Sequence, residues 1–123
     1  MSANFPKSEH IKSEKEITNL FKNGKSIVVF PIRALYLTTN EPQKVKVMVS
    51  APKKLFKKAV SRNYCKRLLR EAYRLNKQQL TSTIAEKNYG INIAFSIIDK
   101  EKPSFQTISE KISIILNKIL LTL

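Results

Sequence analysis

The sequence predicts an α+β fold, in which one central sheet is packed by helices and the elements follow the order α-β-β-β-α-β-α. Two observations lead to this fold class. Apolar residues recur at helical spacing in three segments, at the beginning, middle and end of the chain. Between them, Val45, Val47 and Val49 alternate with Lys46 and Met48, which is typical of a strand with one buried and one solvated face. Helices and strands that are mixed in this way pack as an α+β sheet.

The first helix is predicted over residues 13–23. Ser13 and Glu16 have the spacing of a capping box, in which each side chain bonds the backbone N–H of the other residue. Ile17 and Leu20 fall on one face of this helix, and Gly24 is placed as the residue that follows its last turn.

Four short strands are predicted, and Gly and Pro residues delimit several of them. The turn signal Asn40-Glu41-Pro42 precedes the alternating strand, Pro52 ends it, and Gly90 precedes the last strand. The predicted strands cover residues 26–29, 32–38, 44–50 and 91–98.

Two further helices complete the prediction. One covers residues 58–80, and the other begins at Pro103-Ser104 and runs towards Leu123. The last helix carries an apolar stripe, which we expect to pack in the core; docking of a partner helix is the alternative. The stripe consists of Ile108, Ile112, Ile115 and Ile119.

Length and composition predict one folded domain over residues 1–123, with residues 1–9 disordered. The 123 residues are 42% hydrophobic, which is enough to form a core, and a single cysteine excludes a disulfide within the chain. No stretch approaches the roughly 20 apolar residues of a membrane span. Because the first residues also lack the apolar segment of a secretory signal, we expect a cytoplasmic protein without a membrane partner.

The scarcity of certain residues argues against chemistry by the chain itself. There is one aspartate, one histidine and two glycines, so no phosphate-binding glycine loop or dinucleotide fingerprint can be written. The glutamates are scattered, whereas a two-metal nuclease needs several carboxylates that converge on its ions. We therefore expect no catalytic residue, no metal site, no cofactor and no small-molecule substrate on this chain.

The charge of the chain indicates a polyanionic partner. The net charge is +14, from 23 basic and 9 acidic residues. Residues 53–77 (KKLFKKAVSRNYCKRLLREAYRLNK) hold ten basic residues and one acid, so a fifth of the chain carries a charge of +9.

This basic segment has two different faces when it is drawn as a helix. At about 100° per residue, apolar side chains occupy one side, including Cys65, which we expect to be a buried thiol. The opposite arc spans from about 200° to about 340° and is almost entirely basic. Its members are Arg62, Asn63, Lys66, Arg67, Arg70 and Arg74.

Nucleic-acid binding explains this arc better than a solvated surface does, and composition alone favours RNA over DNA only weakly. Solvated helices normally interleave acids four residues from their basic residues, but here like charges are stacked four apart with only Glu71 to relieve them. Arginine forks suit phosphate oxygens, and Asn63 either bonds the nucleic acid or caps the local backbone. Four preceding lysines are expected to attract phosphates without directional contacts: Lys53, Lys54, Lys57 and Lys58.

The basic segment also carries a recognisable motif. Ala59-Val60-Ser61-Arg62-Asn63, then Lys66-Arg67, then Arg70-Glu71-Ala72 closely resembles the signature of the bacterial ribonuclease P protein subunit. The resemblance covers roughly residues 10–120. It includes the first helix, which ends in Leu20-Phe21-Lys22-Asn23-Gly24, and the valine-rich strand before the motif.

The resemblance implies a function and a set of partners. It implies a small α+β fold with a left-handed βαβ crossover, against the usual rule for parallel strands. The partners would be the catalytic RNA subunit, which holds the magnesium ions and performs the hydrolysis, and precursor tRNA, which loses its 5′ leader. Arg62, Asn63, Lys66, Arg67 and Arg70 match the signature that faces the RNA.

The resemblance further implies a cleft between the first helix and the sheet that accepts the single-stranded leader. Phe21 matches its aromatic position, Ile17 stands where the family often has a second aromatic, and Tyr36 is placed in the cleft from the second strand. Two other functions are considered. One is a general RNA- or ribosome-binding protein without a processing role, and the other is a stand-alone nuclease that would use Asp99, Glu71 or Glu86.

Overall fold

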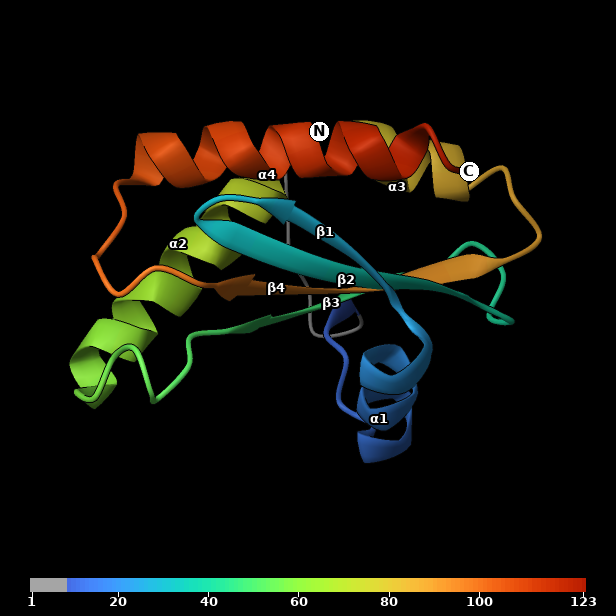
Figure 1. Ribbon diagram of the computed structural model, residues 1–123. Coiled ribbons are helices and arrows are strands. Elements are labelled where there is room, and N and C mark those ends of the chain that lie inside the picture. The colour runs from blue at the N-terminus through green and yellow to red at the C-terminus, as the bar shows by residue number, and fades with distance from the viewer. Residues whose placement is uncertain (1–8) are drawn as a thin grey trace.

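The computed structural model describes residues 9–123 and contains one four-stranded sheet with helices on both faces (Figure 1). Apart from Glu9, whose carboxylate lies 2.8 Å from Lys77 Nζ, the segment predicted to be disordered is outside the described residues. The elements are α1 (Glu14–Asn23), β1 (Lys25–Val29), β2 (Ile32–Thr39), β3 (Val45–Ser50), α2 (Ala59–Asn76), α3 (Gln78–Ile84), β4 (Gly90–Ile97) and α4 (Phe105–Leu120). The α+β class is confirmed, and each predicted strand boundary is correct to within one residue.

The sheet has the order β1-β2-β4-β3. β1 pairs with β2 and β2 pairs with β4 antiparallel, whereas β3 and β4 are parallel. The parallel strands are joined by α2 and α3. When the sheet in Figure 1 is viewed from the side that carries α2, with β3 and β4 pointing upward, β4 lies to the left of β3. The crossover is therefore left-handed, as expected.

The two faces of the sheet are covered unequally. α2 and α4 pack on one face and bury the main core, while α1 packs on the other face (Figure 1). Beneath α1 is a small apolar cluster of Ile11, Leu20, Leu35 and Ala94, with Ile17, Leu37 and Met48 packed against it. The predicted solvated face of β3 is therefore covered in part, because Met48 contacts this cluster.

Local contacts explain where α1 begins and ends. The Ser13 hydroxyl accepts the N–H of Glu16 at 3.4 Å, which confirms this half of the predicted capping box. Gly24 ends the helix with a φ of −71°, so the left-handed conformation is not used. Glycine is needed for space instead, because a Cβ here would lie 2.4 Å from the Leu20 carbonyl oxygen.

The helix predicted over residues 58–80 is divided in two. α2 confirms most of it, over residues 59–76, but the helix breaks at Lys77 and the separate helix α3 follows. At the break, Asn76 Nδ2 donates to the Ala72 carbonyl at 2.7 Å and to Ser109 Oγ at 3.1 Å, so this amide competes with the helical hydrogen bonds and ties α2 to α4. α4 runs towards Leu123 as expected and ends at Leu120.

The apolar stripe of α4 packs in the core, as expected. Ile108, Ile112, Ile115 and Ile119 are each fully buried, and Ser104 caps the helix by accepting the N–H of Thr107 at 3.2 Å. No helix among residues 9–123 is long and apolar enough to cross a membrane.

Candidate nucleic-acid interface

α2 has a buried side and a basic side. Cys65, Leu69 and Tyr73 are fully buried against the main core, together with Ser61, Leu68 and Ala72 on the same side. On the opposite side, Asn63 and Arg67 are exposed, and Lys66 and Arg70 are partly exposed. The core therefore fixes the rotation of α2 about its axis and leaves these polar side chains at the surface.

The central basic residues of α2 have no acidic partner in the described part of the chain. The ion pairs of residues 9–123 involve Lys44, Lys46, Arg74 and Lys77, and none includes Lys66, Arg67 or Arg70. Uncompensated like charges on one helix face repel one another, and a phosphate backbone would relieve this repulsion.

Arg62 has a structural contact that the sequence did not reveal. Its guanidinium donates to the Phe56 carbonyl at 2.8 Å and to the Lys57 carbonyl at 3.0 Å, so it fixes the segment that enters α2. Lys58 is the N-cap residue and makes no side-chain cap. The four lysines of this segment are exposed: Lys53, Lys54, Lys57 and Lys58.

Arg74, at the far end of the arc, forms an ion pair. Its guanidinium donates to the carboxylate of Glu71, one turn earlier, and this hydrogen bond holds the pKa of Glu71 below its ordinary value. Arg74 is therefore already partnered, whereas Lys66, Arg67 and Arg70 have no acidic partner within residues 9–123.

Two hollows lie on either side of the basic face of α2. The first, called here the β3 groove, combines two cations with an apolar floor; its lining is His10, Ile11, Val47, Met48, Val49, Lys66 and Arg70. The second, called here the α2 hollow, is lined by Val60, Asn63, Tyr64, Arg67, Arg70 and Lys102. Sequence reasoning missed the β3 groove because its lining comes from three separate segments of the chain, at residues 10–11, in β3 and in α2. It missed Lys102 because this residue is distant in the chain from α2.

The structure places the three predicted cleft residues on two different faces of the sheet. Phe21 is 55% exposed and Ile17 is partly buried beneath α1. The placement of Tyr36 is wrong, because it belongs to the main core on the face opposite α1. Successive side chains of a strand point to opposite faces, so Leu35 and Leu37 are the β2 residues that face α1.

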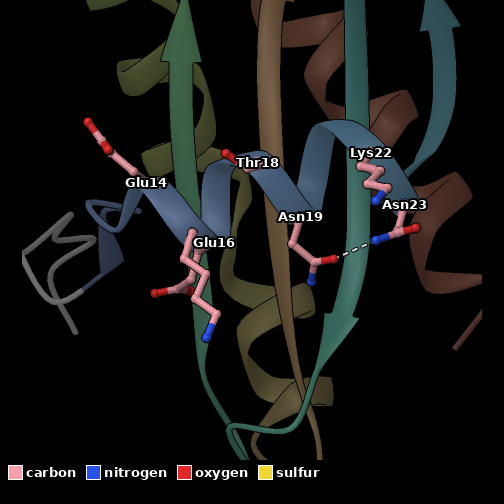
Figure 2. Close-up of a pocket in the computed structure, with 7 residues that line it drawn as sticks. Glu14, Glu16, Thr18, Asn19, Lys22 and Asn23 are labelled. Atoms are coloured by element: carbon pink, nitrogen blue, oxygen red, sulfur yellow. Dashed lines mark hydrogen bonds between the residues drawn. The ribbon is translucent and has the colours of Figure 1, made fainter.

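The outer side of α1 has a hollow of its own, in which Asn23 donates to Asn19 (Figure 2). Every residue that lines this hollow belongs to α1: Glu14, Lys15, Glu16, Thr18, Asn19, Lys22 and Asn23. It is therefore not the predicted cleft, which requires a second wall from the sheet.

A polar cluster fastens the amino end of α1 to the sheet. The Lys46 ammonium on β3 lies 3.2 Å from Glu16 Oε1 and 3.0 Å from Glu41 Oε1. Asn92 of β4, which is buried, donates to Glu16 Oε2 at 3.1 Å. We call these four residues the α1 clamp. It orients α1, and with it Ile17 and Phe21, relative to β3 and β4.

Among residues 9–123, no group of three His, Cys, Asp or Glu side chains is placed to hold a metal ion. The basic face of α2 and its two hollows are thus the candidate site, and comparison with known proteins gives its family. The family model of ribonuclease P matches residues 5–120. The chain belongs to the ribonuclease P protein family.

Members of this family resemble the chain along most of its length. The ribonuclease P protein component of Porphyromonas gingivalis is 41% identical over 104 residues, covering 83% of this chain and 76% of the relative. The corresponding protein of Chlorobium phaeobacteroides is 34% identical over 128 residues, covering 94% and 88%.

Solved structures of family members have the same fold. The ribonuclease P protein from Thermotoga maritima superposes with a TM-score of 0.70 at 25% identity, covering 89% of this chain and 96% of that one. The protein from Staphylococcus aureus gives a TM-score of 0.70 at 21% identity, covering 92% and 96%, and supports the fold alone.

Proposed function

We propose that this chain binds the catalytic RNA of ribonuclease P and the 5′ leader of precursor tRNA, and so assists endonucleolytic removal of the leader. The observation that carries this proposal is the basic face of α2, where Lys66, Arg67 and Arg70 are accessible and have no acidic partner among residues 9–123. Family membership supports the ribonuclease P RNA as this partner.

The chain contributes binding and positioning in this proposal. The magnesium ions that support hydrolysis are held by the RNA subunit. The arginines of α2 contact phosphate oxygens, while the four lysines before α2 add attraction that does not depend on geometry. Neutralising several phosphates releases counterions and lets the complex form at lower magnesium.

The β3 groove is proposed as the path of the leader near α2. Met48 and Val49 provide apolar contact for unpaired bases, and Lys66 and Arg70 lie beside them to hold the backbone. Phe21 and Ile17 on α1 would extend this contact, because α1 covers the same face of the sheet as Met48.

Reconstitution tests the proposal. The protein is added to a bacterial ribonuclease P RNA, and cleavage of precursor tRNA is measured at low magnesium with leader-bearing and leaderless substrates. We expect the protein alone to cleave nothing, to restore RNA-catalysed cleavage at low magnesium and to favour binding of the leader-bearing form. Equal binding of both substrates without activation would instead identify a general RNA-binding protein.

A further inference from the structure

The connection between β4 and α4, residues 98–104, lies against the basic side of α2. The Tyr64 hydroxyl donates to the Pro103 carbonyl at 3.2 Å. The Lys102 ammonium lies 5.7 Å from the centre of the same Tyr64 ring, within the range of a cation–π contact. One side chain of α2 therefore holds this connection and brings Lys102 to the basic face.

The two acidic residues of the same connection, Asp99 and Glu101, do not pair with the positive charge of Lys102. Asp99 Oδ1 accepts the backbone N–H of Glu101 at 3.3 Å, so this carboxylate is turned towards its own loop. Within the described chain, neither acid lies within 4.0 Å of the Lys102 ammonium. Lys102 thus adds a cation to the α2 hollow, beside Arg67 and Arg70.

The two hollows differ in chemistry, and Arg70 lines both. The β3 groove has an apolar floor that suits unpaired bases. The α2 hollow instead presents three cations and the Asn63 amide, with Val60 as its aliphatic residue, which suits the phosphates and sugars of a folded RNA. The basic face of α2 lies between the two hollows.

We infer that the α2 hollow binds the phosphate backbone of the folded RNA subunit, with Lys102 as an RNA ligand supplied from outside the basic helix. Resting on the proposed function, this inference assigns the two sides of α2 to different RNAs. Arg67 and Lys102 face the RNA subunit, Lys66 faces the leader, and Arg70 contacts both.

The test measures the affinity of Lys102→Gln for the RNA subunit without substrate, at several salt concentrations. Losing one phosphate contact should weaken binding by roughly 5- to 10-fold at 0.1 M salt and reduce the slope of log K against log[salt] by about 0.9. The ratio of affinities for leader-bearing and leaderless substrates should stay unchanged. Lys100→Gln is the matched control, because Lys100 is an exposed lysine of the same connection that does not line the hollow.

A second variant tests how Lys102 is held. Tyr64→Phe keeps the ring but loses the hydroxyl that binds Pro103, so it should weaken RNA binding less than Lys102→Gln does. Because both changes act through one contact, the double variant should bind no more than about twofold more weakly than Lys102→Gln. Cooperative melting of each variant shows that the fold is intact.

Two results would overturn the assignment of the α2 hollow while leaving the proposed function in place. In one, Lys100→Gln and Lys102→Gln weaken binding equally, which means that only net charge matters. In the other, Lys102→Gln lowers the preference for the leader and leaves affinity for the RNA subunit unchanged. If the wild-type protein does not bind the RNA subunit at all, both the proposed function and this inference are refuted.

Discussion

Replacement of Lys46 by Met tests the α1 clamp. The ammonium of Lys46 lies 3.2 Å from Glu16 and 3.0 Å from Glu41, and the side chains of Lys46 and Glu16 are 17% and 27% exposed. Methionine fills a similar volume without the charge, so the variant leaves both carboxylates without this cation. Glu16 retains only the hydrogen bond from Asn92 within the clamp.

The expected cost lies between that of exposed and buried ion pairs. Exposed pairs contribute about 0.2–1 kcal/mol, and a buried hydrogen bond to a charged group contributes about 1.5–3 kcal/mol. With two partners and partial burial, we expect a loss of about 2 kcal/mol in the free energy of unfolding. At about 2.1 cal/mol/K per residue, the 123 residues give an unfolding entropy near 0.26 kcal/mol/K, so Tm should fall by about 8 °C.

Thermal and urea unfolding measure this loss, with Lys44→Met as the control. Lys44 contacts Glu41 at 3.9 Å and both side chains are well exposed, so its replacement should cost less than about 0.5 kcal/mol. The main cause that raises the pKa of Lys46 above 10.5 is its hydrogen bond to Glu41; burial opposes it and Glu16 adds to it. The contribution of Lys46 to the free energy of unfolding is therefore present below pH 10.5 and is lost as pH rises through the pKa of Lys46 in the folded protein. Equal Tm values for the two variants would refute the clamp.

Three further predictions concern α2 and α1. Glu71→Gln removes the acid that pairs with Arg74, so RNA affinity should rise and the slope of log K against log[salt] should steepen by about 0.9, as a binding titration would show; an unchanged slope would contradict it. Gly24→Ala places a Cβ 2.4 Å from the Leu20 carbonyl oxygen and should lower stability by about 1–3 kcal/mol in urea unfolding. Burial raises the pKa of the Cys65 thiol, so its alkylation at pH 8 should be more than roughly 100-fold slower in the folded than in the unfolded protein; rapid labelling of folded protein would show that the thiol is accessible.

Local patterns predicted most element boundaries, because caps, turns and alternation depend on neighbouring residues. Ser13 and Glu16 placed the start of α1, and the alternating valines placed β3. The faces of β2 were harder to assign. Ala34, Leu35, Tyr36 and Leu37 are all apolar, so this strand has no polar face that would show which residues point to α1. The resemblance placed Tyr36 in the cleft, and no alternation of polar residues was there to correct it.

The candidate site was predictable in its helix and not in its surroundings. The 3.6-residue period of α2 separated Arg67 and Arg70 from the core-facing residues. Arg62 bonds carbonyls five and six residues before it, which depends on the turn that enters α2 and not on the helical period. The contact between Lys102 and Tyr64 depends on how distant segments cross, and no local pattern records such a crossing. The break at Lys77 likewise depends on a tertiary contact between Asn76 and Ser109.

The place of β4 in the sheet has a consequence for biosynthesis. β4 is the last strand to be translated, yet it lies between β2 and β3, and in the described chain β3 pairs with no other strand. While the polypeptide leaves the ribosome, the β1–β2 hairpin and β3 stay unjoined until residues 90–97 emerge. A nascent chain that ends before Gly90 would expose the basic residues of α2 before the four-stranded sheet that orients this helix is complete.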